Sequence, residues 1–346
     1  MDFWKGKRVF ITGHTGFKGS WLCHILLNAG ADLTGYALSP PTDPNLFTLS
    51  GVEDKMKSVI GDIRDREKLV NEFNKANPEI VIHMAAQPIV RESYTQPAYT
   101  YEVNVMGTIN ILECLRQSEN VKSFLNVTTD KVYYNNEWEW GYRETDSLDG
   151  YDPYSNSKSC SELVTHSYKN AFFENIAIST ARAGNVIGGG DFANERIIPD
   201  CVRAVQSNEQ ITLRNPNSVR PYQHVLEPLT AYLMIMQKQY EDTNYQGYYN
   251  VGPDDADCVS TAVLADIFCR EWGDGLSWVS KQDDGPHEAN FLKLDCSKIK
   301  AKFGWLPRWN IHDAVKRTVE WTKVYLSGGD VAEIMDLQIN EFIKRM

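Results

Sequence analysis

The sequence predicts an α/β protein built on a doubly wound parallel sheet, with a smaller α/β lobe beside it. Strand-like and helical stretches alternate through the first half of the chain, and each predicted strand ends in small or polar residues. Beyond residue 183 the alternation loosens into Gly-, Asn- and Pro-containing segments with shorter helices. Alternation of this kind implies parallel strands joined by helices on both faces of the sheet. Ligands of such sheets bind at the carboxyl ends of the strands.

The elements follow from hydrophobic periodicity and local composition. The predicted strands are residues 8–12, 32–37, 80–84, 122–128 and 176–181, and the predicted helices are residues 17–29, 65–76, 98–117 and 154–173. The first strand is a run of β-branched and aromatic residues, which is typical of a strand buried on both faces. The first helix follows from the apolar spacing of residues 20–27.

The predicted domains are discontinuous in sequence. The main domain covers residues 1–182 and regains segments near 217–255 and 310–327, whereas the smaller lobe consists of residues 183–216 and 256–309. Residues 328–346 form a C-terminal helix with apolar side chains near helical spacing, which we expect to cover the chain's own surface or a neighbouring subunit.

A glycine-rich turn connects the first predicted strand to the first predicted helix. It reads Gly13-His14-Thr15-Gly16-Phe17-Lys18-Gly19. Glycines three apart at such a turn let backbone amides approach a pyrophosphate at the positive end of a helix, as in Rossmann-type dinucleotide-binding folds. A turn without a ligand is the alternative. A bulky His14 is expected either to weaken cofactor retention or to lie at the surface.

Two more predicted turns could face a dinucleotide. Asp62, in the Gly61–Asp65 loop, could hold an adenine edge, although that loop is also an ordinary turn. Ala85 and Ala86 follow a buried strand, and their small side chains leave room for a cofactor or simply allow tight packing.

Thr129-Asp130-Lys131, followed by Tyr154-x-x-x-Lys158, predicts the chemistry. Tyr and Lys four apart share one helix face, and a neighbouring ammonium stabilises phenolate. Tyr154 could then take a proton from an alcohol near neutral pH, while Thr129 bonds the same alcohol oxygen. Asp130 and Lys131 add an acid and a base that simple alcohol oxidation does not need. A lone Tyr-x-x-x-Lys is weak support, but the glycine turn and the strand ends agree with it.

Composition excludes several classes of protein. The formal net charge of −11 argues against nucleic acid as a partner, so an anionic substrate needs a local basic pocket. The 7 Cys contain no C-x-x-C pair, and no metal site is expected. No apolar run is long enough to span a membrane, and we expect a cytoplasmic protein.

These motifs resemble those of the extended short-chain dehydrogenases/reductases, and closely those of the nucleotide-sugar 4,6-dehydratases. Within that family, the string from His14 to Trp21 and the pair Asp130-Lys131 are most similar to the members that act on CDP-glucose. The resemblance rests on residues 13–21, 83–87, 104, 128–133, 154, 158, 182–191, 220–225 and 249–253. It extends to about residue 325.

The resemblance implies NAD as the cofactor. The second predicted strand ends in Ser39-Pro40-Pro41, with no carboxylate for the ribose and no Arg or Lys for a 2′-phosphate, so NADP remains the alternative. Asn104 resembles an Asn that holds a water near the catalytic Lys, and a core-capping role is its alternative. The implied cofactor-binding residues are Gly13, His14, Thr15, Gly16, Phe17, Gly19, Asp62, Ile63, Ala85, Ala86, Gln87, Asn104, Tyr154 and Lys158.

The resemblance also implies residues that bind the nucleotide sugar. They are Asn185, Arg196, Arg220, Asn250 and His287, with Glu288 beside the last. Guanidinium groups suit a diphosphate, although each Arg could instead form a surface ion pair, and Asn250 could belong to a plain turn. Helices 98–117 and 154–173 form the dimer face of similar proteins, so a homodimer or homotetramer is expected.

The implied reaction begins with oxidation of the sugar at C4. Tyr154 takes the proton of the 4-hydroxyl while hydride passes to NAD, and the resulting ketone acidifies the hydrogen at C5. Lys131 removes the C5 proton, Asp130 protonates the departing 6-hydroxyl, and the hydride returns to C6. A protonated Lys131 could instead only stabilise the enolate. The same motifs are compatible with a dTDP-, UDP- or GDP-sugar dehydratase, with a 4-epimerase or decarboxylase, and with a non-catalytic dinucleotide sensor.

Overall fold

The structure, a computed structural model, describes residues 2–281 and 291–344. Within these residues the main sheet has seven parallel strands in the order β11-β6-β5-β4-β1-β2-β3. The strands are β1 (Arg8–Thr12), β2 (Asp32–Ala37), β3 (Lys57–Ile60), β4 (Ile80–His83), β5 (Ser123–Thr128), β6 (Ala177–Arg182) and β11 (Tyr248–Asn250). The order reverses between β1 and β4, which is where parallel sheets of this kind bind ligands.

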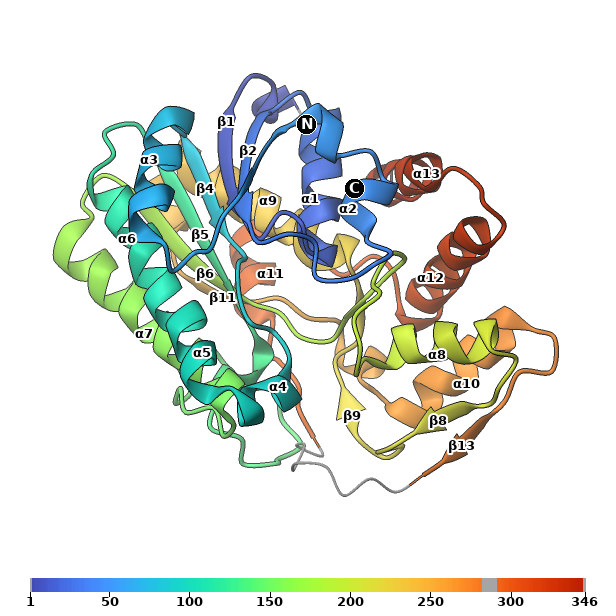
Figure 1. Ribbon diagram of the computed structural model, residues 1–346. Helices are drawn as coiled ribbons and strands as arrows, with labels where there is room; N and C mark the ends of the chain where they lie inside the picture. The colour runs from blue at the N-terminus through green and yellow to red at the C-terminus, as the bar shows by residue number, and fades with distance from the viewer. Residues whose placement is uncertain (1, 282–290, 345–346) are drawn as a thin grey trace.

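Helices cover both faces of this sheet (Figure 1). One face carries α3 (Arg66–Ala76), α6 (Gly107–Arg116) and α7 (Pro153–Phe172), and the other carries α1 (Phe17–Asn28), α9 (Leu226–Glu241) and α11 (Ser297–Phe303). Successive side chains of β1 enter opposite cores, because Phe10 packs with α3 while Val9 and Ile11 pack with α1. The predicted doubly wound α/β fold is confirmed.

Most predicted elements lie within one residue of their observed bounds, and two differences are informative. The predicted helix 98–117 consists of α5 (Pro97–Tyr101), a π-helical segment (Glu102–Met106) and α6. Strands β3 and β11, at the two edges of the sheet, were not predicted. β3 carries no fully buried side chain, and β11 has only three residues and reaches the sheet from far along the chain.

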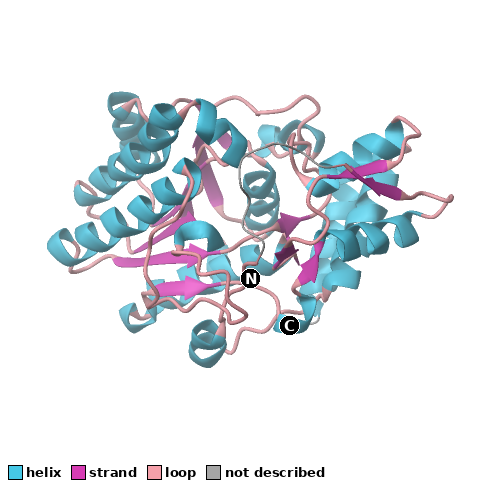
Figure 2. Cartoon of the chain, turned by 90° about the horizontal axis from the view of Figure 1, so that it is seen from below, coloured by secondary structure: helices cyan, strands magenta, loops and turns pink. Residues whose placement is uncertain are grey.

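The smaller lobe contains α8 (Ile197–Gln206), α10 (Thr261–Trp272) and short strand pairs (Figures 1 and 2). The pairs join β8 (Ile211–Leu213) to β13 (Trp278–Ser280), β9 (Val219–Arg220) to β12 (Val259–Ser260), and β7 (Val186–Ile187) to β10 (Gln223–His224).

Two segments differ from the predicted division of the chain. Helix α12 (Ile311–Leu326) packs against α10 and shares a hydrophobic cluster with α8, so it lies with the smaller lobe. Helix α11, predicted in the lobe, instead packs against β11 of the main sheet.

Helix α13 (Val331–Lys344) covers the chain's own surface. Its buried Met335, Ile339 and Phe342 join the cluster that contains α1, and Asp336 accepts a hydrogen bond at 2.7 Å from the imidazole of His24. One of the two expectations for the C-terminal helix is thereby confirmed. No helix among the described residues has the length and apolar character needed to cross a bilayer.

Candidate active site

A cavity of about 320 Å³ lies between the carboxyl ends of the main sheet and the smaller lobe. The first turn of α1, the segments after β4, β5 and β6, and helix α7 line it from the sheet side, and α8, β8, β9 and α10 line it from the lobe. The cavity brings together eight predicted site residues: Phe17, Thr129, Asp130, Lys131, Tyr154, Asn185, Arg196 and Arg220. Four of the five predicted catalytic residues and three of the predicted substrate-binding residues therefore line one cavity, whereas Lys158 and Asn250 do not.

Asp130 is deeply buried at the end of β5. Thr129 caps a single turn of 3-10 helix (Asp130–Val132), and its hydroxyl donates a hydrogen bond of 2.9 Å to Asp130 Oδ1. Gly184, after β6, makes room for this carboxyl, since a Cβ there would lie 1.8 Å from Oδ2. Oδ2 is buried and has no hydrogen-bond partner among the described residues. A buried polar atom without a partner costs free energy, so its lack of a partner is typical of a ligand-binding position.

Tyr154 and Lys158 lie on the first two turns of α7, whose N-terminus is capped by Asp152. The Lys158 ammonium is buried and donates a hydrogen bond of 3.2 Å to the Val127 carbonyl. Burial, followed by the cation of Lys18, lowers the pKa of Lys158 to about 7, and the negative charge of Glu162 opposes both effects.

The pKa of Tyr154 differs from the prediction that the lysine would bring it near neutral. Burial raises that pKa to about 12. A hydrogen bond with Thr129 and the cation of Arg196 lower it, while the negative charge of Asp130 raises it. Desolvation of the phenolate therefore outweighs the favourable contacts, and the Lys158 ammonium donates its hydrogen bond to a backbone carbonyl instead.

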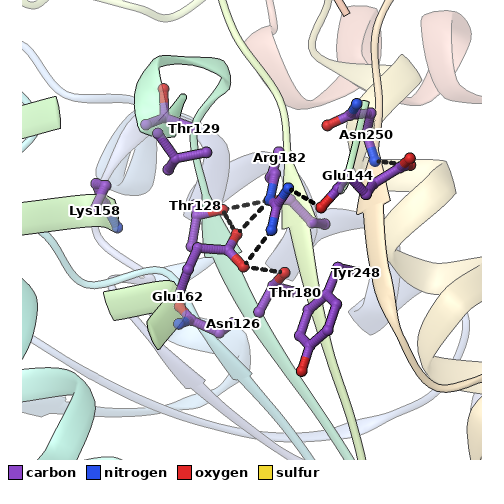
Figure 3. Close-up of polar contacts among 12 residues, drawn as sticks. Asn126, Thr128, Thr129, Glu144, Lys158, Glu162, Thr180, Arg182, Tyr248 and Asn250 are labelled. Carbon is purple, nitrogen blue, oxygen red and sulfur yellow. Dashed lines mark hydrogen bonds and ion pairs between the residues drawn. The ribbon is translucent and has the colours of Figure 1, made fainter. Parts of the chain in front are cut away.

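A second set of charges fixes α7 to the sheet, and sequence reasoning missed it (Figure 3). Arg182, at the end of β6, forms two hydrogen bonds of 3.0 Å with the Glu162 carboxylate. Thr128 and Thr180 donate to the same carboxylate at 2.5 and 2.7 Å. Because Glu162 lies one turn after Lys158 and Thr128 precedes Thr129, the network holds the two segments that carry the predicted catalytic residues in register. An arginine at the end of an otherwise uncharged strand was the signal in the sequence.

The glycine turn forms a cradle that fits a dinucleotide pyrophosphate. Gly13 has φ 78°, and a Cβ there would lie 2.7 Å from the amide nitrogen of Ala85. A Cβ on Gly19 would lie 2.3 Å from the Gly13 carbonyl oxygen, so the turn and the helix can approach this closely only as glycines. Gly16 precedes α1, and no side chain caps the helix. The amides of the first turn remain available for phosphate oxygens.

His14 is neither at the surface nor charged. Its side chain is fully buried, Nε2 lies 2.8 Å from Ser58 Oγ, and the ring packs against Phe47. Burial lowers its pKa to about 4, which keeps the imidazole neutral at physiological pH. The ring occupies the space above Gly35 of β2, where a Cβ would lie 2.3 Å from it. The surface alternative for His14 is therefore wrong.

The remaining predicted cofactor residues lie at strand ends, several of them already bonded within the chain. Phe17 and Thr15 belong to the glycine turn, where the Thr15 hydroxyl donates to the Leu38 carbonyl at 2.9 Å. Asp62 forms a two-pronged ion pair with Arg64, at 3.1 and 2.8 Å, which lowers the pKa of its carboxyl. Ile63 is buried in the core beside α6.

Asn104 connects three parts of the chain. Its Oδ1 accepts a hydrogen bond of 2.9 Å from the Gln87 amide, and its Nδ2 donates to the Gln87 carbonyl at 3.1 Å and to Ser157 Oγ at 2.9 Å. These bonds tie the loop after Ala85 and Ala86 to α7. The core-capping alternative describes this arrangement better than a water-holding role.

Asn250, a predicted substrate-binding residue, does not line this cavity. It is fully buried, accepts from the Tyr133 hydroxyl at 2.6 Å, and donates to the carbonyls of Tyr142 and Asp295. Its amide is thus engaged in holding β11 to neighbouring loops. His287 and Glu288 lie outside the described residues.

The lobe side of the cavity supplies cations and one free amide oxygen. Arg196 pairs with Asp191 at 3.0 Å, and this carboxylate raises its pKa. Arg220 is buried and donates to the Val219 carbonyl at 2.9 Å. Asn185 has φ 41°, and its buried Oδ1 has no partner among the described residues. Lys18 also lines the cavity, although the sequence reasoning assigned it no role.

The fold and this cavity define an extended short-chain dehydrogenase/reductase. The sequence profile of the family described as GDP-mannose 4,6 dehydratase matches residues 10–318. The chain is 48% identical over 350 residues to the CDP-glucose 4,6-dehydratase of Salmonella typhimurium, covering 99% of this chain and 98% of that protein. It is 27% identical to a probable dTDP-glucose 4,6-dehydratase of Sinorhizobium fredii, covering 93% of each. The chain belongs to this family of nucleotide-sugar dehydratases.

Solved structures share the fold. The UDP-glucose 4-epimerase of Thermotoga maritima, with UDP-glucose, has a TM-score of 0.81 at 22% identity, covering 92% of this chain and 99% of that chain. The dTDP-glucose 4,6-dehydratase of Bacillus anthracis, in complex with NAD, has a TM-score of 0.77 at 20% identity, covering 93% and 98%. Both likenesses concern the fold alone.

Proposed function

We propose that the chain is a NAD-dependent CDP-glucose 4,6-dehydratase, which converts CDP-glucose to CDP-4-keto-6-deoxyglucose and water. The observation that carries this proposal is the full-length similarity to a CDP-glucose 4,6-dehydratase at 48% identity, together with a cavity that contains both Tyr154 and the pair Asp130-Lys131. The neutral His14 and the glycine cradle at α1 fit a bound dinucleotide. NAD, when bound, accepts the hydride of C4 and returns it to C6.

The residues of the cavity move the protons of this reaction. Tyr154 takes the proton of the 4-hydroxyl, and Thr129 touches both Tyr154 and Asp130. We therefore infer a path for this proton from Tyr154 through the Thr129 hydroxyl to Asp130, which delivers it to the departing 6-hydroxyl. Loss of water needs one such proton, and oxidation of the 4-hydroxyl releases one, so the path balances the two steps. Lys131 is the proposed base at C5, or the cation that stabilises the enolate.

The basic side of the cavity suits the diphosphate. Arg196, Arg220 and Asn185 line the part of the cavity that faces the smaller lobe. A guanidinium group can donate two parallel hydrogen bonds to two oxygens of one phosphate. The ion pair with Asp191 holds the Arg196 guanidinium in place before the substrate binds. When a phosphate replaces Asp191 as its partner, the guanidinium is still paired with a negative charge.

A 4-epimerase is the second candidate, because the epimerase of Thermotoga maritima shares the fold. An epimerase needs no acid and base beside Thr129. The buried Asp130 and the adjacent Lys131 therefore favour dehydration.

Product analysis tests the proposal. The protein is incubated with NAD and one nucleotide sugar at a time, namely CDP-, dTDP-, UDP- or GDP-glucose. The mass of each product is then measured by mass spectrometry. Loss of one water from CDP-glucose, at the highest kcat/KM of the four, is the expected result. Unchanged mass would identify an epimerase, and faster dehydration of dTDP-glucose would make the assignment of the base wrong. Binding of NAD without turnover would indicate a sensor.

We also propose a homodimer, or a tetramer built from it. Met106, Leu163 and Phe172 expose 49%, 52% and 51% of their surface on the helical layer that contains the π-helical segment and α7. Large apolar side chains at this density are typical of a helix-packing interface. Sedimentation that shows only monomer at micromolar concentration would contradict the dimer.

A further inference from the structure

A carboxylate of the smaller lobe joins two arginines that line the active-site cavity. Oε2 of Glu195, in the segment before α8, lies 3.5 Å from Nε of Arg91, and the same oxygen forms an ion pair with Nη1 of Arg214. All three residues line the cavity, and sequence reasoning assigned none of them a role. One oxygen of Glu195 is thus shared by two guanidinium groups.

The ion pair between Arg91 and Glu195 connects the two domains. Arg91 lies on α4 (Val90–Thr95), which packs against α5 and α7 of the main domain (Figure 1). Glu195 precedes α8 and Arg214 follows β8, so both belong to the smaller lobe. Because the cavity lies between these two domains, this ion pair crosses the space that a nucleotide sugar has to occupy.

Two of the contacts around these arginines are loose. The 3.5 Å between Arg91 and Glu195 exceeds the usual length of an N–H···O hydrogen bond, and so does the 3.7 Å between Arg214 Nη2 and Asp200 Oδ2. The side chains of Arg91, Arg214 and Glu195 are 29%, 32% and 41% exposed, so water screens their attraction. Ion pairs with this exposure contribute little to stability, and another anion can replace Glu195 at a small cost in free energy.

The backbone of Glu195 is strained. Its φ of 62° lies in the left-handed region, which residues with a Cβ rarely adopt. The chain just before it is fixed, because Arg203 donates to the Ala193 carbonyl at 3.2 Å and the Ala193 amide donates to Asp191 at 3.1 Å. A strained residue that its surroundings hold in place is typical of ligand clamps and switch regions.

Two guanidinium groups around one carboxylate are also suited to a phosphate. Carboxylate and phosphate oxygens accept the same charge-assisted hydrogen bonds from arginine. A diphosphate offers more oxygens and more negative charge than one carboxylate, so it can compete with Glu195 for Arg91 and Arg214 together. The Glu195 side chain is partly exposed, so water can solvate its carboxylate after the exchange.

We propose that Arg91 and Arg214 form a binding site for the diphosphate of the nucleotide sugar, and that Glu195 occupies this site as an internal counter-ion until the diphosphate displaces it. Arg91 belongs to the main domain and Arg214 to the smaller lobe, so a bound diphosphate takes over the connection between the domains that Glu195 makes in the unliganded protein. This inference rests on the proposed function, which supplies a nucleoside diphosphate as the ligand.

The test measures the affinity for CDP, which carries no hexose and is not turned over, by isothermal titration calorimetry with NAD at saturation. Glu195→Gln keeps the size of the side chain but removes its charge. This variant should bind CDP at least ~3-fold more tightly than the wild type, the factor that corresponds to an exposed ion pair. Arg91→Gln and Arg214→Gln should each weaken CDP binding by at least ~10-fold, because each removes hydrogen bonds to a charged group.

Two controls separate the contact from a general effect of charge. Glu209→Gln makes the same change in net charge at an exposed residue of the same lobe that does not line the cavity, and it should leave CDP affinity unchanged. In a variant that already carries Arg91→Gln and Arg214→Gln, Glu195→Gln should no longer tighten CDP binding, because its partners are gone. Thermal unfolding and NAD binding confirm that each variant is folded. Should the double arginine variant fail this check, Arg91→Gln alone is the background, and the gain should be reduced there.

Unchanged or weaker CDP binding by a folded Glu195→Gln would overturn the inference. An equal gain in Glu209→Gln would overturn it too, because net charge alone would then explain the effect, and so would an undiminished gain in the arginine variants. Failure of the wild-type protein to dehydrate CDP-glucose would overturn the proposed function instead. The affinities for CDP, UDP and dTDP would still decide the role of Glu195, and lack of binding of all three would overturn the inference.

Discussion

Two groups of charged and polar side chains lie at the carboxyl ends of the main sheet. In one group the buried polar atoms have hydrogen-bond partners within the protein, and in the other several have none among the described residues. Around Arg182 and Glu162, two threonine hydroxyls and the guanidinium satisfy the carboxylate, and the two side chains are only 2% and 1% exposed (Figure 3). In the cavity, Asp130 Oδ2 and Asn185 Oδ1 have no partner among the described residues, and neither has the Lys18 ammonium. We call the group around Arg182 and Glu162 the complete cluster, because its polar atoms are bonded within the protein. We call the polar residues that line the cavity, Tyr154 and Lys131 among them, the incomplete cluster, because it leaves donors and acceptors for a ligand.

This contrast separates folding from chemistry. A satisfied buried network adds rigidity, whereas unpartnered polar groups around a cavity cost stability that only a bound substrate recovers. Glu162 of the complete cluster lies on the same helix, α7, as Tyr154 and Lys158. The bonds of Glu162 to Arg182, Thr128 and Thr180 therefore also fix the position of those two side chains. Substitutions in the two clusters should therefore have different effects.

The largest effect on stability is expected for Arg182→Met. It leaves the Glu162 carboxylate buried without its cation, so the free energy of unfolding should fall by about 3–5 kcal/mol. Urea denaturation measures the change. Arg143→Met is the matched control, because Arg143 pairs with Asp295 at 3.3 Å while its side chain is 73% exposed, and its loss should cost less than about 1 kcal/mol. Equal destabilisation by the two substitutions would contradict the structural role of the buried pair.

Tyr154→Phe should show the reverse pattern. It removes the phenolic oxygen from the incomplete cluster, so turnover should fall by at least ~10²-fold, the scale of a positioned acid–base group, while the thermal midpoint stays close to that of the wild type. Lys158→Ala should also be severely impaired. Wild-type turnover by a folded Tyr154→Phe that still binds NAD would remove Tyr154 from the reaction.

Glu227 tests whether an unpartnered buried oxygen always indicates function. Its Oε1 accepts from the amides of Arg308 and Trp309 at 2.9 and 2.8 Å, and its Oε2 is buried with no partner among the described residues, outside the cavity that holds the predicted catalytic groups. Burial raises the pKa of Glu227 to about 7. We therefore expect this acid to have a structural role only, in contrast to the role proposed for Asp130.

The sign of the pH dependence follows from that raised pKa. The stability that Glu227 contributes is present below its unfolded pKa of about 4.3 and is lost as pH rises through about 7, because the folded protein must then bury a charge. Glu227→Gln should therefore increase the free energy of unfolding at pH 8 by about 2 kcal/mol, with little change at pH 4 and no change in kcat. A loss of turnover in this variant would mean that the contrast between the two classes of buried acid is wrong.

The fold was predictable because its signals are local. Apolar runs, glycine turns and helical periodicity placed most strands and helices of the main sheet. Strand β11 could not be predicted, because three residues are too few to show the alternation of a strand. The position of helix α12 could not be predicted either, because the pattern of an amphipathic helix does not show which hydrophobic core it packs against. The packing of α12 against α10 rather than the main sheet is a property of the tertiary structure.

The site was predictable only in part for a similar reason. Spacing on one helix predicted Tyr154 and Lys158 as site residues, and the strand end predicted Thr129 and Asp130; Tyr154, Thr129 and Asp130 do line one cavity. An asparagine that binds a ligand looks the same in sequence as one that binds the protein's own backbone, and the Asn250 amide donates to two backbone carbonyls in the structure. Long-range partners such as Arg182 and Glu162 leave even less trace in the sequence.

We expect the residues of the incomplete cluster to act in two separable steps. Tyr154 and Thr129 act in the oxidation at C4, and Asp130 and Lys131 act in the elimination of water. Lys131→Met separates them, because it keeps the length and apolar stem of Lys131 but removes the amine, and leaves Tyr154, Thr129 and Lys158 untouched. The decisive measurement is single-turnover absorbance of NADH with CDP-glucose in heavy water, followed by deuterium analysis at C5. If Lys131 is the base, NADH accumulates and persists, water is not lost, and no deuterium enters C5. Dehydration and C5 exchange at the wild-type rate would contradict this account, and the role of base would pass to another group of the cavity.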